Sequence, residues 1–437
     1  MRYTFLFLFV FSNIVCSYGQ EWAVKLDSVL KIIAKDELFD GQVLIAEHGN
    51  IVFDKAYGHL SDGTAITCTT PLAVKSITKG FTAAAILNLA QEGKLNLSDE
   101  VSVYIPNWPY KGMTIRHLLS MSSGLPNFLE KAIEFADTTK YMTNQDIIKL
   151  IVAHPVAVRP SGYYYKYQNS NYITLAAIIE NISGKSYTDY IIENLFKPLK
   201  LEHTYLEDLT SNEKQADGDT FYAPYGDGNL HSTAEDLFRF EQSFYGNDIL
   251  RKTYVDSTFQ KTRLHDGSLS KYGLGWWVID NQPKTEYYIL GDGPNIRASI
   301  QRFPDTHSTL IFIHNVSGRN WHDVYWVVRN IWYGNEFKMP VKSDLSRYDI
   351  DIKLYDNYVG SYLSKGFGLL HVTKEDDKLY VRPDPIPGKE ELIPSSDTTF
   401  YFADKSVEWE FFLNEDGSVK GFGFKGKPET IGIKQNK

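Results

Sequence analysis

The chain has 437 residues, of which 43% are hydrophobic and 23% are charged, with 29 Tyr and 25 Phe. That length exceeds what one hydrophobic core usually supports, so two domains are expected, and the composition is that of a folded globular protein. The formal net charge of −9 argues against nucleic acid as a partner, and the spacing of the histidines contains no metal signature such as His-Glu-x-x-His, so no cofactor is expected.

The first residues predict an export leader. Arg2 is followed by an apolar run over residues 5–15, and the small residues Ser17 and Gly19 have a spacing that suits cleavage after Gly19. The run is shorter than the roughly 20 residues of a membrane span, and no later stretch reaches that length. We therefore expect an exported protein, periplasmic or extracellular, with residues 1–19 as signal peptide and no transmembrane span.

Cys16 leaves a lipoprotein anchor as the alternative to a cleaved leader. The residues before it (13–15) lack the small residue expected at an anchoring site, so the anchor is the less favoured interpretation. Removal of the leader also removes Cys16 and leaves Cys68 as the single cysteine. The mature chain then cannot form an internal disulfide.

After the leader, the pattern predicts strands at both ends of a helical region. A helix is expected over 22–34, and residues 41–58 predict a hairpin around a turn at 48–50. Residues 76–90 are rich in Ala and Leu and predict a helix. Further helices are expected at 114–121, 144–154, 171–182 and 233–244, and strand and turn patterns return at 289–315. This order predicts an α/β (α+β) fold with one antiparallel sheet built from distant segments.

From about residue 344 the pattern changes to short alternating runs separated by turns. The expected strands cover 358–362, 369–372, 378–381, 399–402, 407–413 and 419–424. They predict a small all-β barrel or sandwich of about 90 residues. We place the two domains at 20–340 and 345–437. The second domain contains no obvious catalytic cluster, so its expected role is to support the structure or to restrict the access of substrate.

Ser76 and Lys79 are the first candidate catalytic pair. A serine hydroxyl needs a neighbouring base, and a lysine three residues later on a helix lies on the same face. At the start of the helix, the backbone N–H of Ser76 and the positive end of the helix dipole can stabilise an oxyanion. The Ser-x-x-Lys spacing also occurs at Ser28, Ser211 and Ser268, but at Ser76 it opens a long apolar helix after a polar loop.

Tyr167 and Asn169 are the second candidate pair, in a segment that holds five tyrosines between residues 163 and 172. Residues two apart in an extended segment point to the same side, so the phenol and the amide can face one cavity. The phenol can pass a proton to a leaving group, and the amide can hold Lys79 and a substrate carbonyl. Packing is the alternative role for these tyrosines. Gly80 leaves room for the close approach of another element.

Together these segments resemble the serine β-lactamase and penicillin-binding protein superfamily, in particular its class C and D-Ala-D-Ala carboxypeptidase-like esterase and peptidase branch. Five further segments carry the resemblance in order, namely 114–126, 196–204, 231–240, 272–277 and 302–315. The resemblance implies an antiparallel sheet flanked by helices and a C-terminal lipocalin-like β-barrel. It also implies that Ser76 and Lys79 are the Ser-x-x-Lys pair and that Tyr167 and Asn169 are the Tyr-x-Asn pair.

The third motif of the superfamily, Lys-Thr-Gly or His-x-Gly, is altered here. Counted back from Pro304 without gaps, it falls on Ile289-Leu290-Gly291, so the glycine is kept and the cation is lost. In this register the backbone N–H of Asp292 is the second oxyanion donor beside that of Ser76. The lost cation helps to recognise a substrate carboxylate, so strong β-lactamase activity is not expected.

Two alternatives remain around this motif. A shifted register on Gly291-Asp292-Gly293 needs a gap and places Pro294, which has no N–H, at the donor position. Arg297 follows shortly after and can replace the lost cation if its side chain turns into the cleft, whereas a surface or sheet salt bridge is the favoured role.

The expected function is that of a serine hydrolase that acts on a small-molecule or peptide substrate. Ser76 attacks an ester or amide, an acyl-enzyme forms, and water releases it with proton transfers through Lys79 and Tyr167. The substrate is a D-amino-acid peptide, a cell-wall fragment or a small ester. The alternative is a catalytically silent binding protein on the same scaffold, in which the lost cation signals lost chemistry. The oligomeric state is left open.

Overall fold

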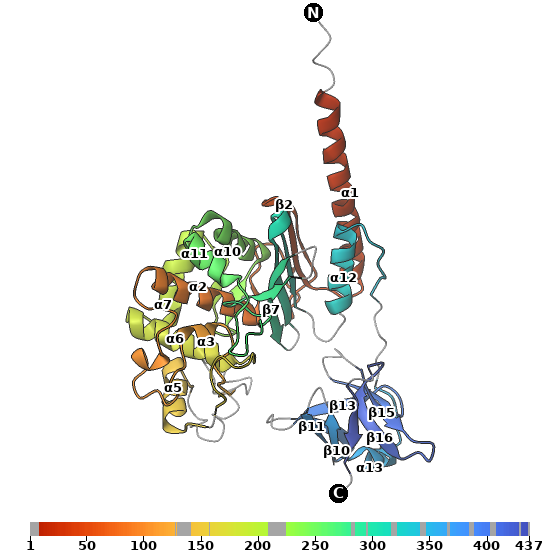
Figure 1. Ribbon diagram of the computed structural model, residues 1–437. Coiled ribbons are helices and arrows are strands. Elements are labelled where there is room, and N and C mark those ends of the chain that lie inside the picture. Colours follow the sequence, from red (N-terminus) through yellow and green to blue (C-terminus); the bar gives the residue numbers. More distant parts are fainter. Residues whose placement is uncertain are drawn as a thin grey trace, which may run out of the picture. The chain divides into compact units, whose positions relative to one another are not determined.

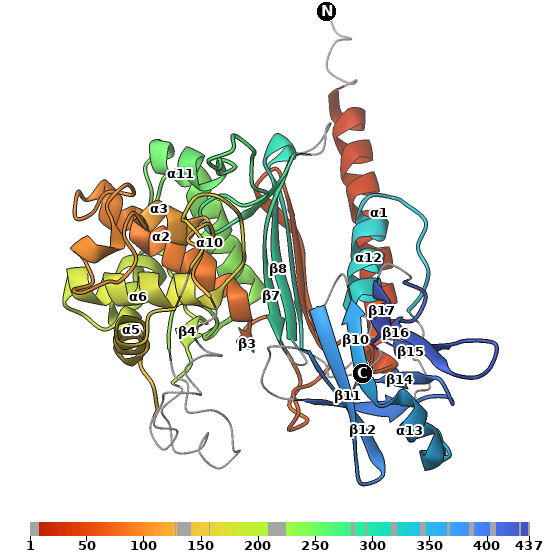
Figure 2. The ribbon, with the colours of Figure 1, turned by 60° about the horizontal axis from the view of Figure 1, so that its bottom comes forward.

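The structure is a computed structural model of the chain. It describes residues 8–126, 128, 141–156, 158–208, 224–280, 285–293, 296–315, 321–340, 347–364, 368–383, 389–402, 408–427 and 430–435. The chain divides into two compact units, which comprise residues 1–315 with 328–336 and residues 316–327 with 337–437. Figures 1 and 2 show the two units from two directions.

The first unit is built on a six-stranded antiparallel sheet with the strand order β2-β1-β9-β8-β7-β6. Its strands are β1 (Gly41–Glu47), β2 (Asn50–Tyr57), β6 (Trp277–Ile279), β7 (Glu286–Gly293), β8 (Ile296–Phe303) and β9 (Ser308–His314). β1 pairs with β9, with Gly41 opposite His314. This pairing confirms the prediction of one antiparallel sheet from distant segments.

Helices cover both faces of this sheet. The helices of the first unit are α1 (Leu8–Lys35), α2 (Thr78–Gln91), α3 (Ile115–Leu119), α5 (Asn144–Ala153), α6 (Asn169–Ser183), α7 (Tyr187–Ile191), α8 (Lys197–Leu199), α10 (Ala234–Gly246) and α11 (Lys252–Thr258), and α12 (Trp321–Trp332) is divided between the two units. Figures 1 and 2 show α2, α3, α5, α6, α10 and α11 gathered on one face, with α1 along the other. α2 is buried from Thr78 to Ala90 on all sides, which makes it the central helix of the unit.

Short elements complete the first unit. They are the 3₁₀ turns η1 (Lys75–Ile77), η2 (Val101–Val103) and η4 (Pro304–Thr306), the π-turn η3 (Ile192–Phe196), and a three-stranded sheet with the order β3 (Leu72–Ala73), β5 (Leu230–Ser232) and β4 (Tyr205–Leu206). β3 leads directly into η1 and α2. Through this sheet, the segment that ends in β5 lies beside the start of α2, because Leu230 N donates to Thr78 Oγ1 at 3.1 Å.

Local sequence explains several boundaries. The hairpin turn between β1 and β2 has positive φ at His48 (52°) and Gly49 (77°), which is the backbone that tight hairpins require. α10 begins at Ala234 because the Thr233 side chain caps it and accepts from the backbone N–H of Asp236 at 3.2 Å. The helix predicted from residue 76 begins instead as the 3₁₀ turn η1 and becomes α-helical at Thr78.

α1 begins upstream of the cleavage point predicted after Gly19. It contacts the sheet where the Tyr57 hydroxyl donates to Asp27 Oδ1 at 2.8 Å. Residues 1–7 of the expected leader lie outside the described residues, and the leader stays a prediction. Within the described ranges, the structure holds no helix with both the length and the apolar character needed to cross a membrane.

The second unit is a closed eight-stranded barrel in which each strand pairs antiparallel with the next in sequence and β10 pairs with β17. It contains η5 (Ile352–Leu354), α13 (Tyr355–Tyr358), β10 (Gly360–Ser364), β11 (Gly368–Glu375), β12 (Lys378–Pro383), β13 (Glu390–Pro394), β14 (Thr399–Tyr401), β15 (Glu408–Leu413), β16 (Val419–Phe424) and β17 (Gly432–Lys434). Its core includes Tyr358 stacked on Phe411, with ring centroids 4.2 Å apart. The barrel is confirmed, whereas β13 and β17 were not predicted.

Candidate active site

Ser76 lies at the junction between β3 and the central helix α2. It is the middle residue of η1, where Lys75 has a φ of 45° and the chain turns sharply into the helix. Thr78 fixes this turn, because its Oγ1 donates to the carbonyl of Lys75 at 2.7 Å. The Ser76 side chain is half-buried. The turn therefore presents a partly accessible hydroxyl at the start of a buried helix.

Lys79 lies one helical turn further along and is almost fully buried, with 1% of its surface exposed. Its Nζ donates to Ser76 Oγ at 2.9 Å and to the backbone carbonyl of Asp227 at 2.7 Å. A buried amine held by these two partners has one orientation, with its nitrogen directed at the serine hydroxyl. The structure thus brings Ser76 and Lys79 into the contact that a nucleophile and its base require.

Asp227 is a residue of the site that the sequence did not single out. It lies between Gly226 and Gly228, and Gly226 has a φ of 106° with its Cα packed against α6, so a Cβ there would lie 2.7 Å from the Cβ of Ala176. This close packing brings the Asp227 carbonyl to Lys79. Burial raises the pKa of the Asp227 carboxyl, while the positive charges of Lys79 and Lys75 oppose the rise. In the sequence, the Gly-Asp-Gly run at residues 226–228 was the feature that could have pointed to Asp227.

Tyr167 reaches the same place from the loop before α6. Lys79 Nζ lies 5.1 Å from the centroid of the Tyr167 ring. The ring is held on its other sides by Trp277, stacked at 6.4 Å, and by Tyr272, at 6.5 Å and 86°. The structure therefore places Tyr167 beside Lys79 and within an aromatic cluster, so the packing role and the site role coincide.

Asn169 is the first residue of α6 and is half-buried. Within the described part of the chain its side chain forms no hydrogen bond with Lys79. The amine's second partner is the Asp227 carbonyl instead. The sequence therefore placed Asn169 near the pair but assigned it a contact that the backbone of another segment makes.

Strand β7 forms the wall of the site opposite the helices. Gly291 lies against η1 so closely that a Cβ there would collide with the carbonyl oxygen of Val74. Two residues earlier, Ile289 is 3% exposed and packs on Gly80 of α2, where a Cβ would collide with Ile289 Cδ1. At the expected position of the third-motif cation, the structure thus has an apolar side chain buried against the helix. The close approach expected at Gly80 is made by Ile289.

Asp292 and Arg297 face away from this wall. Because Ile289 and Gly291 point toward the helices, Asp292 points to the other face of the sheet, and 71% of its side chain is exposed. Asp292 pairs across the β7–β8 hairpin with Arg297, whose Nη1 lies 2.6 Å from Asp292 Oδ1. Arg297 therefore makes a salt bridge within the sheet and does not replace the lost cation. Pro294, on which the shifted register depends, lies outside the described residues.

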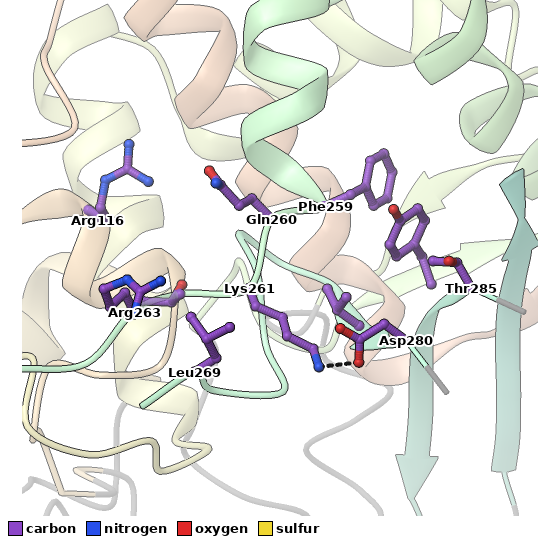
Figure 3. Close-up of a pocket in the computed structure, with 11 residues that line it drawn as sticks. Arg116, Phe259, Gln260, Lys261, Arg263, Leu269, Asp280 and Thr285 are labelled. Carbon is purple, nitrogen blue, oxygen red and sulfur yellow. Dashed lines mark hydrogen bonds and ion pairs between the residues drawn. The ribbon is translucent and has the colours of Figure 1, made fainter. Parts of the chain in front are cut away.

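A cavity of about 560 Å³ opens elsewhere in the first unit and is shown in Figure 3. Arg116 and Arg263 lie on one side of it, and an ion pair between Lys261 and Asp280 lies on the other. Its lining contains none of the six residues that the sequence singled out. In the described residues, no group of three or more His, Cys, Asp and Glu side chains could hold a metal ion. The candidate site is the one at Ser76 on the evidence of the Ser76–Lys79 contact.

A half-buried serine bonded by a buried lysine, at the start of a central helix that packs on an antiparallel sheet, defines a protein of the β-lactamase and penicillin-binding class. Comparison with known families agrees. The sequence profile of the β-lactamase family matches residues 32–329, and a family described as a domain of unknown function (DUF3471) matches residues 349–436. The chain belongs to the β-lactamase family and is a serine hydrolase of that general type.

Relatives extend over both units. Penicillin-binding protein 4* of Bacillus subtilis (strain 168) is 31% identical over 433 residues, which cover 90% of this chain and 94% of the relative. The solved octameric penicillin-binding protein homologue from Pyrococcus abyssi is 22% identical, with a TM-score of 0.58 and coverage of 94% and 99% of the two chains. The D-amino acid amidase from Ochrobactrum anthropi SV3 is 19% identical, with a TM-score of 0.59 and coverage of 72% and 99%. These two structures are similar in fold.

Proposed function

We propose that the chain hydrolyses a carboxylic ester or amide through an acyl-enzyme on Ser76. The observation that carries the proposal is the buried Lys79 amine, held at 2.9 Å from Ser76 Oγ by the Asp227 carbonyl on its far side. A neutral amine in this position accepts the hydroxyl proton as Ser76 Oγ attacks the substrate carbonyl. The carbonyl carbon gains the bond to oxygen, and its π electrons move to the carbonyl oxygen.

We assign the stabilisation of the negatively charged oxygen that forms to two backbone N–H donors. They are the N–H of Ser76, at the start of α2, and the N–H of Asp292, one residue after the glycine that lets β7 approach η1. Collapse of the intermediate breaks the bond to the leaving group. Tyr167, beside Lys79, passes the proton from the lysine to that group, and a water molecule then reverses the sequence to release the acid.

The substrate classes we propose are D-amino-acid peptides or amides, cell-wall fragments and small esters. The names of the relatives support the first two, since they include a penicillin-binding protein and a D-amino acid amidase. Ile289 argues against efficient β-lactam hydrolysis, because it buries an apolar side chain at the position where the family pattern has a cation. Asn169 is assigned to substrate binding on its place beside Tyr167.

We further propose that residues 1–19 are an export signal, that residues 20–340 form the hydrolase domain and that residues 345–437 form the barrel domain. The leader pattern supports the first proposal. The positions at which the two family profiles match support the proposed bounds of the two domains. Sequencing the N-terminus of the exported protein tests the leader: a mature chain that begins at Gln20 is expected, and an unprocessed Met1 would contradict it.

The hydrolase proposal is tested by labelling and turnover. A fluorophosphonate probe should label the purified chain at Ser76 and leave Ser76→Ala unlabelled, and a panel of p-nitrophenyl esters and D-amino-acid amides should be turned over only by the wild type. Equal rates for the wild type and Ser76→Ala, together with absent labelling, would reject the proposal. That result would favour the silent binding protein instead.

A further inference from the structure

The cavity of Figure 3 has the size of a small-molecule site, and none of the residues proposed for catalysis lines it. Its volume of about 560 Å³ lies within the range of about 300–1,000 Å³ that is usual for ligand pockets. The lining comes from α3, from residues 259–263 after α11, from Leu269, and from the neighbourhood of β6 and β7. These walls belong to one compact unit.

The wall that carries Arg263 is a short hairpin held in place by its backbone. Ser270 N donates to the carbonyl of Thr262 at 2.9 Å, and near the tip His265 N donates to the carbonyl of Gly162 at 2.9 Å. Arg263 Nη1 donates to the Gly267 carbonyl at 2.8 Å, which restricts the orientation of its guanidinium group. Within the described residues, the other N–H groups of this guanidinium have no partner in the protein.

Positive charge exceeds negative charge around the cavity. Arg116 and Arg263 lie on one side, and Lys261 lies on the other, where Asp280 neutralises it. In the part of the chain that the structure describes, no carboxylate forms an ion pair with either arginine. Part of the Arg116 side chain is enclosed, and this burial lowers its pKa without an opposing carboxylate charge. Two uncompensated guanidinium groups in a chain with a net charge of −9 indicate a place that attracts an anion.

The side of the cavity away from the two arginines is apolar. Phe259 lies there and stacks on Tyr287, with ring centroids 4.4 Å apart, and Val278 is 5% exposed. A second cavity of about 650 Å³ shares Phe259, Gln260 and Tyr287 with the first. A ligand therefore has apolar surface to contact and room to extend past the two rings.

We propose that this cavity binds an organic dianion with an apolar body. The anionic groups lie at Arg116 and Arg263, whose planar guanidinium forks donate charge-assisted hydrogen bonds, and the apolar body lies toward Phe259 and Tyr287. Two cations without carboxylate partners match two negative charges. A phosphate monoester and a dicarboxylate both carry this charge at neutral pH. The inference does not depend on hydrolysis at Ser76.

The test titrates two aromatic dianions into the purified chain and follows the broadening of their proton NMR signals. Phenyl phosphate and isophthalate distinguish a phosphate group from a pair of carboxylates, and at least one of them should bind saturably. Phenol, which is neutral, should not bind detectably, and inorganic phosphate should compete more weakly than phenyl phosphate because it lacks the ring. Added salt should weaken the binding, since it screens the two guanidinium charges.

Five variants locate the binding. Arg116→Met and Arg263→Met should each weaken it by about 10-fold or more, the effect of losing hydrogen bonds to a charged group. Arg263→Lys keeps the charge but not the fork and should weaken it less than Arg263→Met. Arg251→Met removes an exposed arginine that lines neither cavity and should bind as the wild type does. Ser76→Ala should also bind normally. Melting curves of all five variants show whether each is folded.

The outcomes separate this cavity from the hydrolase site. If neither dianion binds saturably, or if folded Arg263→Met binds as tightly as the wild type, the cavity is not an anion site. Binding of phenol as tight as that of phenyl phosphate would also overturn the inference, because the apolar wall would then suffice. If a fluorophosphonate on Ser76 abolishes the binding, the dianion occupies the hydrolase site instead. None of these results changes the test of hydrolysis at Ser76.

Discussion

Replacement of Lys79 by methionine separates catalysis from folding at this site. Methionine has nearly the length of the lysine stem but removes the two hydrogen bonds that Nζ makes, at 2.9 Å to Ser76 Oγ and 2.7 Å to the Asp227 carbonyl. Hydrogen bonds of a neutral group stabilise by about 0.5–1.5 kcal/mol each. The removal of a buried polar amine offsets this loss, because its desolvation costs about 1–3 kcal/mol.

The two effects on stability are similar in size and opposite in sign. A difference of about 1 kcal/mol moves the Tm of a domain of this kind by roughly 2–4 °C, so Lys79→Met should melt within a few degrees of the wild type. Lys79→Ala should melt lower than Lys79→Met, because truncation of a side chain that is 1% exposed also leaves a cavity, at about 2–5 kcal/mol. Thermal unfolding followed by circular dichroism measures both.

Lys79→Met should affect catalytic activity far more than it affects stability. Loss of a general base lowers kcat by about 10²- to 10⁴-fold, so Lys79→Met should lose nearly all turnover of a p-nitrophenyl ester although it is folded. The double variant Ser76→Ala/Lys79→Met should be no worse than Ser76→Ala, because the two residues act as one unit. A Lys79→Met protein that keeps more than a tenth of wild-type kcat would refute the assignment of Lys79 as the base.

Three further predictions concern the neighbouring contacts. Gly80→Ala should lower Tm, because the Cβ of the new alanine collides with Ile289. In a double-mutant cycle, the second change Ile289→Ala should recover part of this loss. If the losses of the two single variants simply add, the collision is not the cause. Tyr167→Phe should slow an amide far more than a p-nitrophenyl ester, which needs no proton on its leaving group, and equal slowing would argue against proton transfer by Tyr167. Burial and the charge of Glu235 raise the pKa of Asp54, so the folded state resists ionisation of this carboxyl and loses stability as the pH rises above about 4. Asp54→Asn should therefore match the wild type in Tm at acid pH and exceed it at pH 7, and an advantage confined to acid pH would reverse the sign of this reasoning.

The sequence predicted those parts of the fold that follow from local patterns. The hairpin at His48 and Gly49, the central helix and the alternating strands of the barrel were found because side-chain periodicity and turn residues act over a few positions. The strands β13 and β17 were missed, since Glu390–Pro394 and Gly432–Lys434 are short and carry charged, proline or glycine residues. Their pairing with neighbouring strands makes them strands, and pairing is not a local property.

The candidate site also has contacts that the sequence predicted and contacts that it did not. The contact of Ser76 and Lys79 was predicted because residues three apart on a helix are neighbours and because, among the four Ser-x-x-Lys sites, this one opens a long apolar helix after a polar loop. The spacing did not predict which other group bonds to the Lys79 amine. The Asp227 carbonyl that holds it is 148 residues away in the sequence, and it arrives there through the packing of Gly226 against α6.

By itself, then, the sequence predicted the family, the fold class and the contact between Ser76 and Lys79. The tertiary structure decided the surroundings of that pair: Ile289 buried against Gly80, Arg297 turned away to Asp292, and the Lys75 stem laid over Gly293. These are contacts between segments far apart in the chain. Their geometry depends on how closely backbones approach at glycines and on which face of a strand each side chain occupies, and neither is encoded in the spacing of a motif.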